Sequence, residues 1–330
     1  METRLFRRKD IQMAVKAWNA SVENRDMVYS RKDEATFAKI FMDSPYYTED
    51  LMLVSEIDGK FAGFASGMIK KEYLQGENFD NTPGYITFVL VSPEYRRKGI
   101  GTALLSELCS RFSKLGKKSA AITYRNPMML EWIVPCSPGA SHNNAPGVAI
   151  TSPAYGFFLS SGFIHQRTED GLYLALAQYR MPEKACKKEA RLSHEGITVC
   201  FYDRNRHWGF EELFDALHGE VWRKTIQDNE KREKPLPVLI AAQGDRIVGF
   251  AGPIDKELSG RGWFNGIATH PNFERRGIAT VLFCRLMEEF TAIDAAYSTI
   301  FTDEGNPALL LYLDTGFVVG ERFAVMERDI

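Results

Sequence analysis

The sequence has few cysteines, and no two of them stand in CxxC spacing. The cysteines are odd in number and widely scattered, at Cys109, Cys136, Cys186, Cys200 and Cys284. This spacing indicates neither a zinc site nor a disulfide framework. We therefore expect free thiols in a reducing compartment and no bound metal.

Long apolar runs and an excess of one charge are also lacking. No stretch of about 18 apolar residues is present to span a bilayer. The N-terminus, which begins with residues 1–4, lacks the apolar stretch of a signal peptide. The formal net charge is -2, so no overall field draws the chain to nucleic acid or to an anionic membrane. We expect a cytoplasmic protein with no nucleic-acid or membrane partner.

What is present is an ordinary globular composition at a length suited to two domains. The 330 residues exceed the usual size of one core, and 45% of them are hydrophobic and 25% charged, which is typical of a folded chain. We predict an N-terminal domain over residues 1–180, a linker over 181–195 and a C-terminal domain over 196–330. The many charges of the linker are interpreted as solvation.

Two hairpins mark the beginning of a repeat. Strands 51–57 and 61–69 flank Asp58-Gly59, a strong signal for a two-residue turn. Strands 238–243 and 246–251 flank Gly244-Asp245 in the same way. The two hairpins therefore predict the same local structure in both halves.

The elements after each hairpin also match. An apolar strand follows, at 85–91 and at 263–269, and each ends two residues before a proline. A basic, glycine-containing turn comes next, and then a helix whose apolar residues recur every three or four positions. Each half closes with Gly-Phe, at Gly162 and Gly316. This shared order predicts an internal duplication.

The first half carries an insertion. Pro93 and Gly162 are 69 positions apart, whereas Pro271 and Gly316 are 45 apart. The extra residues fit the segment 126–153, which is rich in proline, glycine and asparagine. Loops this long are uncommon unless they bind, close a site or are disordered. Both a binding loop and disorder remain open.

The turn at residues 91–102 carries the chemistry. A helix N-terminus offers unpaired backbone N–H groups and the positive end of its dipole, and Gly99 and Gly101 let phosphate oxygens approach that backbone. Arg96, Arg97 and Lys98 add charge-assisted donors. The sequence thus predicts a pyrophosphate cradle, whereas the alternative is a plain turn with solvated basic residues.

The pyrophosphate cradle is favoured by the repetition of its sequence pattern and by the absence of other phosphate-binding motifs. The same pattern returns at residues 269–280, which makes a chance turn a poorer explanation. Neither GxxxxGK[ST] nor GxGxxG is present, which argues against an ATP or NAD enzyme.

Both turns resemble the acetyl-coenzyme A loop of the GNAT superfamily of N-acetyltransferases, whose signature is Gln/Arg-x-x-Gly-x-Gly/Ala. Residues 96–101 read Arg-Arg-Lys-Gly-Ile-Gly, and residues 274–279 read Glu-Arg-Arg-Gly-Ile-Ala. The resemblance covers most of each half. It implies an α/β fold of two tandem GNAT-like domains, each with a mixed, mostly antiparallel central sheet flanked by helices.

The resemblance also implies where coenzyme would bind. The strand before each loop pairs with the pantetheine arm, and the thioester meets the amine in a gap beside that strand. In the first half the implied residues are Val89, Leu90, Val91, Arg96, Arg97, Lys98, Gly99, Ile100, Gly101 and Thr102. In the second half they are Ile267, Ala268, Thr269, Arg275, Arg276, Gly277, Ile278, Ala279, Thr280 and Asn306.

A second family signature lies at residues 306–317, which resemble Asn…Ala…Leu-Tyr-x-x-x-Gly-Phe. The resemblance implies that Tyr312 protonates the leaving thiolate, a form of general acid catalysis. The alternative is an aromatic side chain of the core. The first half has Phe158 at this position, and a phenyl ring cannot donate a proton.

The two halves depart from the family in different places. Glu274 stands at the first loop position of the second half, where a carboxylate repels phosphate. We therefore expect the tighter coenzyme site in the first half and the catalytic tyrosine in the second. Neither strand before a loop contains an acidic residue, so no general base is assigned, although Asp303 and Glu304 are distant candidates.

The expected activity is the transfer of an acetyl group from acetyl-coenzyme A, used as a co-substrate, to a primary amine. The acceptor is a small molecule or a peptide, attacked directly in a ternary complex, and the protein is a monomer or a homodimer. The alternative is a non-catalytic coenzyme A-binding or protein-interaction module with degenerate sites.

Overall fold

The computed structural model describes residues 1–135, 137 and 139–330, so Cys136, one of the expected free thiols, lies outside the described residues. The other cysteines, Cys109, Cys186, Cys200 and Cys284, are free thiols. In the part of the chain that is described, no helix is both long and apolar enough to cross a bilayer.

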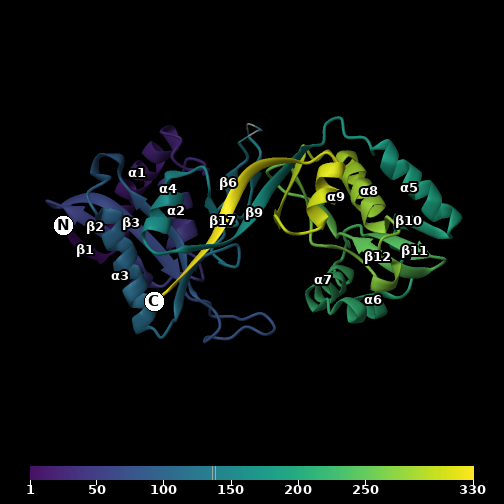
Figure 1. The fold of residues 1–330 in the computed structure, drawn as a ribbon, viewed down its shortest axis with the longest axis horizontal. Helices are drawn as coiled ribbons and strands as arrows, with labels where there is room; N and C mark the ends of the chain where they lie inside the picture. The colour runs from purple at the N-terminus through teal and green to yellow at the C-terminus, as the bar shows by residue number, and fades with distance from the viewer. Residues whose placement is uncertain (136, 138) are drawn as a thin grey trace. The chain divides into compact units, whose positions relative to one another are not determined.

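The chain forms two compact units (Figure 1). Unit 1 comprises Met1–Gly171, Phe301–Glu304 and Val319–Ile330, and unit 2 comprises Leu172–Ile300 and Gly305–Val318. The chain therefore crosses between the units more than once, unlike the predicted division at residues 181–195. Those residues contain a helix, α5 (Glu183–His194).

Unit 1 is built on a mixed sheet. Its strand order is β1-β2-β3-β4-β5-β17-β9, with β8 beside β17, and β4 and β5 are parallel. Its strands are β1 (Glu2–Leu5), β2 (Met52–Ile57), β3 (Lys60–Met68), β4 (Gly84–Val91), β5 (Ser119–Ile122), β6 (Trp132–Ile133), β7 (Ser141–His142), β8 (Val148–Ala149), the first part of β9 (Ile164–Ala175) and most of β17 (Val318–Asp329). Its helices are α1 (Ile11–Glu23), α2 (Glu34–Phe41), α3 (Ile100–Lys114) and α4 (Pro153–Ser160).

Unit 2 repeats this plan. The ladder β10-β11-β12-β15 is antiparallel, whereas β14 pairs antiparallel with β13 and parallel with β16. Its strands are β10 (Ile197–Phe201), β11 (Leu239–Gln243), β12 (Arg246–Ala251), β13 (Ile254–Lys256), β14 (Arg261–Phe264), β15 (Ile267–Thr269) and most of β16 (Tyr297–Asp303). Its helices are α5, α6 (Phe210–Leu217), α7 (Glu220–Glu230), α8 (Ile278–Ala292) and α9 (Ala308–Asp314). The predicted fold class, two tandem α/β units with mixed sheets flanked by helices, is confirmed.

The duplication is visible in matched packing. A Cβ added at Gly84 would lie 2.4 Å from Cγ of Phe112, and one added at Gly262 would lie 2.5 Å from Cγ of Phe290. Each phenylalanine is fully buried and follows its turn proline by 19 positions. Each glycine therefore lets the long helix of its unit lie flat on the sheet.

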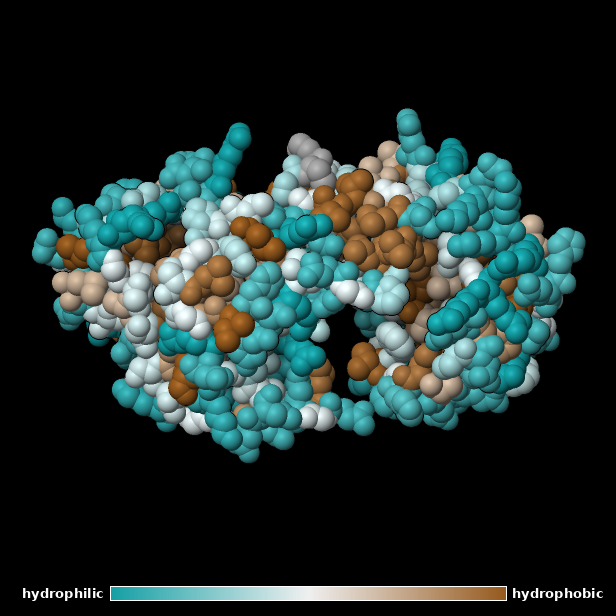
Figure 2. All heavy atoms as spheres, viewed as in Figure 1, coloured by the Kyte–Doolittle hydropathy of each residue, from teal (hydrophilic) through white to brown (hydrophobic). Residues whose placement is uncertain are grey.

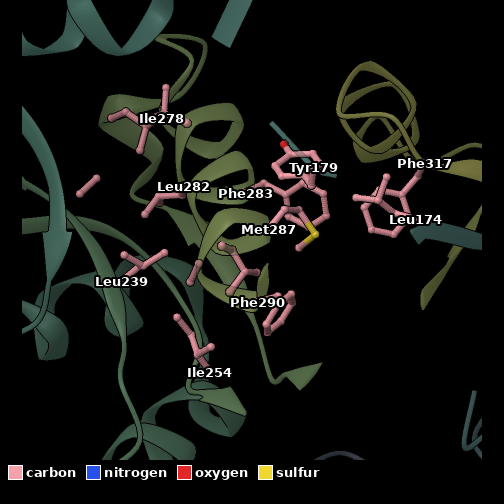
Figure 3. Packing of buried hydrophobic residues seen from close by; sticks show 14 of the residues in the cluster. Leu174, Tyr179, Leu239, Ile254, Ile278, Leu282, Phe283, Met287, Phe290 and Phe317 are labelled. Atoms are coloured by element: carbon pink, nitrogen blue, oxygen red, sulfur yellow. The ribbon is translucent and has the colours of Figure 1, made fainter. Parts of the chain in front are cut away.

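The core of unit 2 shows how α8 covers its sheet. Ile278, Leu282, Phe283, Met287 and Phe290 recur at helical spacing on its buried side (Figure 3). They pack with sheet residues such as Leu239 and Ile254, which is the arrangement that the apolar periodicity predicts.

One predicted strand of unit 2 is wrong. Residues 263–269 do not form a single strand, because the chain leaves the ladder between β14 and β15. A Cβ at Gly266 would lie 2.5 Å from Nε1 of Trp222 on α7. The equivalent residue of unit 1 is Phe88, whose ring stacks on Phe64. In unit 2 the Trp222 ring packs on Phe250 instead, so an indole from α7 fills the space that Phe88 fills in unit 1.

The inserted segment 126–153 is ordered where it is described. Strands β6 and β7 form a small ladder, and β8 pairs with β17. Trp132 is fully buried and packs edge-on against Phe323, with ring centroids 4.9 Å apart. Of the two possibilities left open by the sequence, disorder is therefore excluded for the described part of this segment.

Helix α5 has two unlike faces. Ala185 and Leu192 are buried where the helix packs against α8. Its outer surface is hydrophilic in the space-filling view (Figure 2). Apolar residues gather instead over α9 on the same face of unit 2, where Leu310 and Leu313 are exposed.

Candidate functional site

The turn between β4 and α3 is shaped as an anion cradle. Arg97 and Gly99 adopt left-handed backbone angles, with φ of 61° and 80°. In the described structure the backbone N–H groups of residues 97–102 donate to no acceptor, and the first bond of the helix runs from the Ala103 N–H to the Gly99 carbonyl. Free amides at a positive helix end fit a phosphate group.

The turn before α8 has the same backbone. Arg275 and Gly277 have φ of 60° and 90°, and the N–H of Val281 donates to the carbonyl of Gly277. The N–H groups of residues 275–280 also lack an acceptor within the described chain. The repeated geometry, down to an arginine in the left-handed region, follows from the repeated sequence.

A cavity of about 790 Å³ opens beside the first turn. It is lined by β4, by the turn, by the face of α4 and by the connection between α1 and α2, which we call the roof (residues 24–33). The lining residues are Ser21, 26–29, 86–91, 95–97, 99–102, Ile122, 147–149, 152–154, 156–158 and Ser160. A volume of this size is within the range of small-molecule and cofactor pockets.

The cavity follows the gap between β4 and β5. These strands pair only at Gly84 with Ala120 and at Tyr85 with Ala121. Beyond that point β4 carries a bulge, because Ser66 and Gly67 of β3 lie opposite Phe88 and Ile86, leaving the residue between them unmatched. Bulges bend strands and end pairing, so the later part of β4 turns one edge toward the cavity.

The sequence-predicted residues of the first half are brought together here. Val89, Leu90, Val91, Arg96, Arg97, Gly99, Ile100, Gly101 and Thr102 all line the cavity. A Cβ at Gly99 would meet nothing within 4 Å, so the space over the turn is open. Lys98 is directed elsewhere: its Nζ lies 3.3 Å from the carbonyl of Glu94 and above the Tyr95 ring.

Arg96 does not point freely at the turn. Its Nη1 donates to Oδ2 of Asp26 at 2.6 Å, and its Nη2 donates to Oγ of Ser21 at 2.8 Å. Its Nε also lies 3.2 Å from the carbonyl oxygen of Val91. Arg96 therefore fastens the roof to the end of β4, whereas Arg97 is exposed and makes no ion pair within the described residues.

The second turn is partly covered by α5. The side chain of Lys188 lies against Gly277, where an added Cβ would be 3.0 Å from Lys188 Cδ. Nζ of Lys188 donates to Oγ1 of Thr280 at 3.1 Å, and Nη2 of Arg191 donates to the carbonyl of Arg276 at 2.5 Å. The second turn is therefore less open than the first. Ile267, Ala268, Thr269 and Ala279 are half-buried around it, Ile278 is buried in the core, and Arg275 is exposed.

The helices that close each half differ at one position. Phe158 of α4 is buried against Phe163 and lines the cavity. Tyr312 of α9 is half-buried, and its ring centroid is 5.0 Å from that of Phe283. Burial raises the pKa of the Tyr312 phenol. Asn306 caps α9, because its Oδ1 accepts the N–H of Ala308.

Several lining residues carry no local sequence signal. Asp26 is the one carboxylate among the described residues that line the cavity, and it is paired with Arg96. Tyr29 lies in the roof, and residues 147–149 come from the insertion. Their roles depend on contacts with distant segments, and only the length of the insertion pointed toward a binding element.

Comparison with known proteins supports the repeat. The sequence profile of the acetyltransferase (GNAT) family matches residues 16–128 and 201–317. No curated protein matches the sequence.

Solved structures share the fold at low sequence identity. The glucosamine N-acetyltransferase region of a fungal multidomain β-N-acetylglucosaminidase has a TM-score of 0.67 at 17% identity, over 99% of this chain and 38% of that one. An N-acetyltransferase of Sphaerobacter thermophilus has a TM-score of 0.59 at 15% identity, over 99% and 95%. A tandem GNAT protein from the clavulanic acid biosynthesis pathway has a TM-score of 0.55 at 13% identity, over 99% and 98%.

The first of these is much longer than this chain, which spans 38% of its length. The other two are covered almost completely, so they are similar in length to this chain. The two matched regions cover most of the chain and coincide with the two copies of the turn and its flanking elements. The chain therefore belongs to the acetyltransferase (GNAT) family.

Proposed function

We propose that the protein is an N-acyltransferase that moves an acetyl group from acetyl-coenzyme A to a primary amine. The cavity of unit 1 carries this proposal, because it joins an anion cradle to an unpaired strand edge in one continuous space of about 790 Å³. A pyrophosphate would be held by the free amides of residues 97–102 and by the Arg97 guanidinium. The pantetheine amides would pair with the edge of β4.

We assign the tighter coenzyme site to unit 1. Its turn is open above Gly99, whereas Lys188 lies on Gly277 in unit 2. The first turn also begins with Arg96, where the second begins with Glu274, a carboxylate that repels phosphate unless it turns away.

Direct attack in a ternary complex is the mechanism that fits the lining. No cysteine is among the described residues that line the cavity, and the thiol of Cys109 is buried in the core. An amine held beside the thioester reacts faster through proximity alone, because a bimolecular step becomes effectively unimolecular.

The acceptor is proposed only as a primary amine of a small molecule or peptide. Glucosamine is a sensible first candidate, since one similar structure is a glucosamine N-acetyltransferase region. Polyamines, amino acids, aminoglycosides and peptide N-termini complete a useful panel.

For unit 2 we keep Tyr312 as the proposed proton donor. Its buried phenol stays protonated near neutral pH, since burial raises its pKa. Tyr312→Phe tests this role directly, because it removes one oxygen and keeps the ring against Phe283. Loss of turnover would place the reaction in unit 2, and unchanged turnover would leave it in unit 1.

The test of function is turnover over the amine panel, with thiol release and the mass of the product as readouts. We expect acetylated product from at least one amine. Gly99→Glu, whose carboxylate stands where phosphate would approach, should remove the part of the turnover that depends on the unit 1 site. A second candidate function is a binding module without turnover, which Phe158 favours. Binding of acetyl-coenzyme A with no product from any amine would support that candidate.

A further inference from the structure

Unit 1 lacks a hydroxyl at the position where the second half has Tyr312. Phe158 stands there, yet a thiolate leaving from coenzyme A in the unit 1 cavity still needs a proton. Another side chain of the cavity must supply it, or water must.

Most of the hydroxyls that line the cavity are already engaged. Those that accept or donate a hydrogen bond to the protein belong to Ser21, Thr87, Ser152 and Ser160. The side-chain hydroxyls of Tyr29, Tyr95 and Thr102 make no hydrogen bond within the described residues. Tyr95 and Thr102 belong to the turn that would hold phosphate, whereas Tyr29 lies on the roof.

The roof holds Tyr29 in a fixed place. Its backbone bridges to Trp132 of the insertion, and the carbonyl of Val28 accepts the N–H of Ile133 at 2.6 Å. On the other side, the indole N–H of Trp18 donates a hydrogen bond to the carbonyl oxygen of Ser30, with Nε1 and the oxygen 2.9 Å apart. Anchors on both sides make this a preorganised position for a side chain.

The ring of Tyr29 lies against the strand that would carry the pantetheine. Its centroid is 5.4 Å from that of Phe88 in edge-on contact and 5.6 Å from that of Trp18. Phe88 follows the bulge at which β4 parts from β5. The phenol is therefore close to the gap in which the thioester would lie, and burial raises its pKa, so it is protonated at neutral pH.

We infer that Tyr29 is the catalytic residue that gives its proton to the departing thiolate in unit 1, an inference that rests on the proposed function. The amine nitrogen attacks the acetyl carbon and a C–N bond forms. The C–S bond breaks, its electron pair passes to sulfur, and sulfur takes the phenolic proton. The nitrogen then loses a proton, through water, to the phenolate, so Tyr29 is restored.

The experiment measures thiol release from acetyl-coenzyme A with hydroxylamine as the nucleophile, using the full chain. Hydroxylamine is uncharged at neutral pH, so it needs no general base and little recognition. Tyr29→Phe keeps the ring and removes the proton donor. Tyr47→Phe is the matched control, because Tyr47 packs against the same core cluster and does not line the cavity. Coenzyme binding is measured for every variant by calorimetry.

We take the thiol release that Gly99→Glu removes as the turnover of unit 1. In Tyr29→Phe we expect this turnover to fall by about 100-fold or more, the usual size of a general acid effect, with coenzyme binding unchanged and Tyr47→Phe fully active. Unchanged turnover of unit 1 in Tyr29→Phe would overturn the inference and leave the proposed function standing. Loss of coenzyme binding together with activity would also overturn it, since the role would then be structural. A wild-type protein that binds acetyl-coenzyme A without accelerating thiol release would contradict the proposed function itself.

Discussion

Met326, four residues from the C-terminus, lies opposite Ile122 in the antiparallel ladder between β17 and β5. The strand that follows β5 in the sheet of unit 1 therefore comes from the other half of the sequence (Figure 1). The first half sends its own corresponding strand, β9, onward to pair with β16. The duplicated halves have exchanged their closing strands, so the candidate site of unit 1 depends on residues from both ends of the chain.

Gly147→Ala tests this dependence. A Cβ at Gly147 would lie 2.3 Å from the carbonyl oxygen of Ala324 on β17, so the strands must separate or shift. We expect a lower unfolding temperature and weaker binding of acetyl-coenzyme A, because residues 147–149 line the cavity. Gly156→Ala is the control, since it lines the same cavity and its Cβ would meet nothing within 4 Å. Equal binding by both variants would contradict the link between β17 and the site.

Arg97 and Arg96 should behave differently although they are neighbours. Arg97→Ala removes an exposed cation from the turn. We expect Kd for acetyl-coenzyme A to rise about tenfold or more, since a hydrogen bond to a charged group contributes about 1.5–3 kcal/mol. Binding of acetyl-coenzyme A by this variant should also depend less on salt concentration than binding by the wild type. Calorimetry at two salt concentrations measures both effects. Arg275→Ala, at the same backbone position of the second turn, should change Kd much less.

Asp26→Asn is the matched test for Arg96. If Arg96 acts on the roof, Arg96→Gln and Asp26→Asn should be coupled in a double-mutant cycle of the KM for the amine, because the two side chains share one ion pair. Additive effects would indicate that Arg96 contacts the coenzyme instead.

The pH dependence of turnover should reflect the protonated phenol of Tyr29. Burial raises its pKa above the usual value of about 10, and the protonated form is the active one. We therefore expect kcat with hydroxylamine to stay level between about pH 7 and 10 and to fall only above that range. A fall of kcat centred below the ordinary tyrosine pKa would contradict this assignment.

The matched glycines under the long helices make a stability prediction. In Gly84→Ala the new methyl would press on the fully buried ring of Phe112, and in Gly262→Ala on that of Phe290. Overpacking of this kind costs about 1–3 kcal/mol, so each variant should lower the free energy of unfolding measured with denaturant. The two effects should add in the double variant, because the sites lie in different units and share no partner.

Much of the architecture could be predicted from sequence because its signals are local. Hairpin turns, helical periodicity and the two glycine-containing turns all act over a few residues, and they repeat. The exchange of β9 and β17 could not be predicted. Alternation of apolar side chains indicates that a segment forms a strand, but it does not indicate which strand pairs with it. Two equivalent strands satisfy the same pattern in either sheet.

For the candidate site, the backbone of the turn could be predicted from sequence, whereas the contacts of its side chains could not. Gly99 and Gly101 were assigned by what the turn demands of them, which is local. Asp26, the partner of Arg96, is 70 positions away in the sequence. The residues around Asp26 contain no motif that indicates this ion pair. The break at Gly266 is similar, since it depends on the indole of Trp222 from a helix far back in the chain.

The most direct test of the central claim, that unit 1 holds the tighter coenzyme site, is calorimetric titration with acetyl-coenzyme A of the wild type, Gly99→Glu and Gly277→Glu. Both glycines have left-handed backbone angles, so the two substitutions impose similar strain, and thermal unfolding confirms that each variant is folded. We predict that Gly99→Glu abolishes the tight binding and that Gly277→Glu retains it. Tight binding that survives Gly99→Glu and disappears with Gly277→Glu would contradict the account.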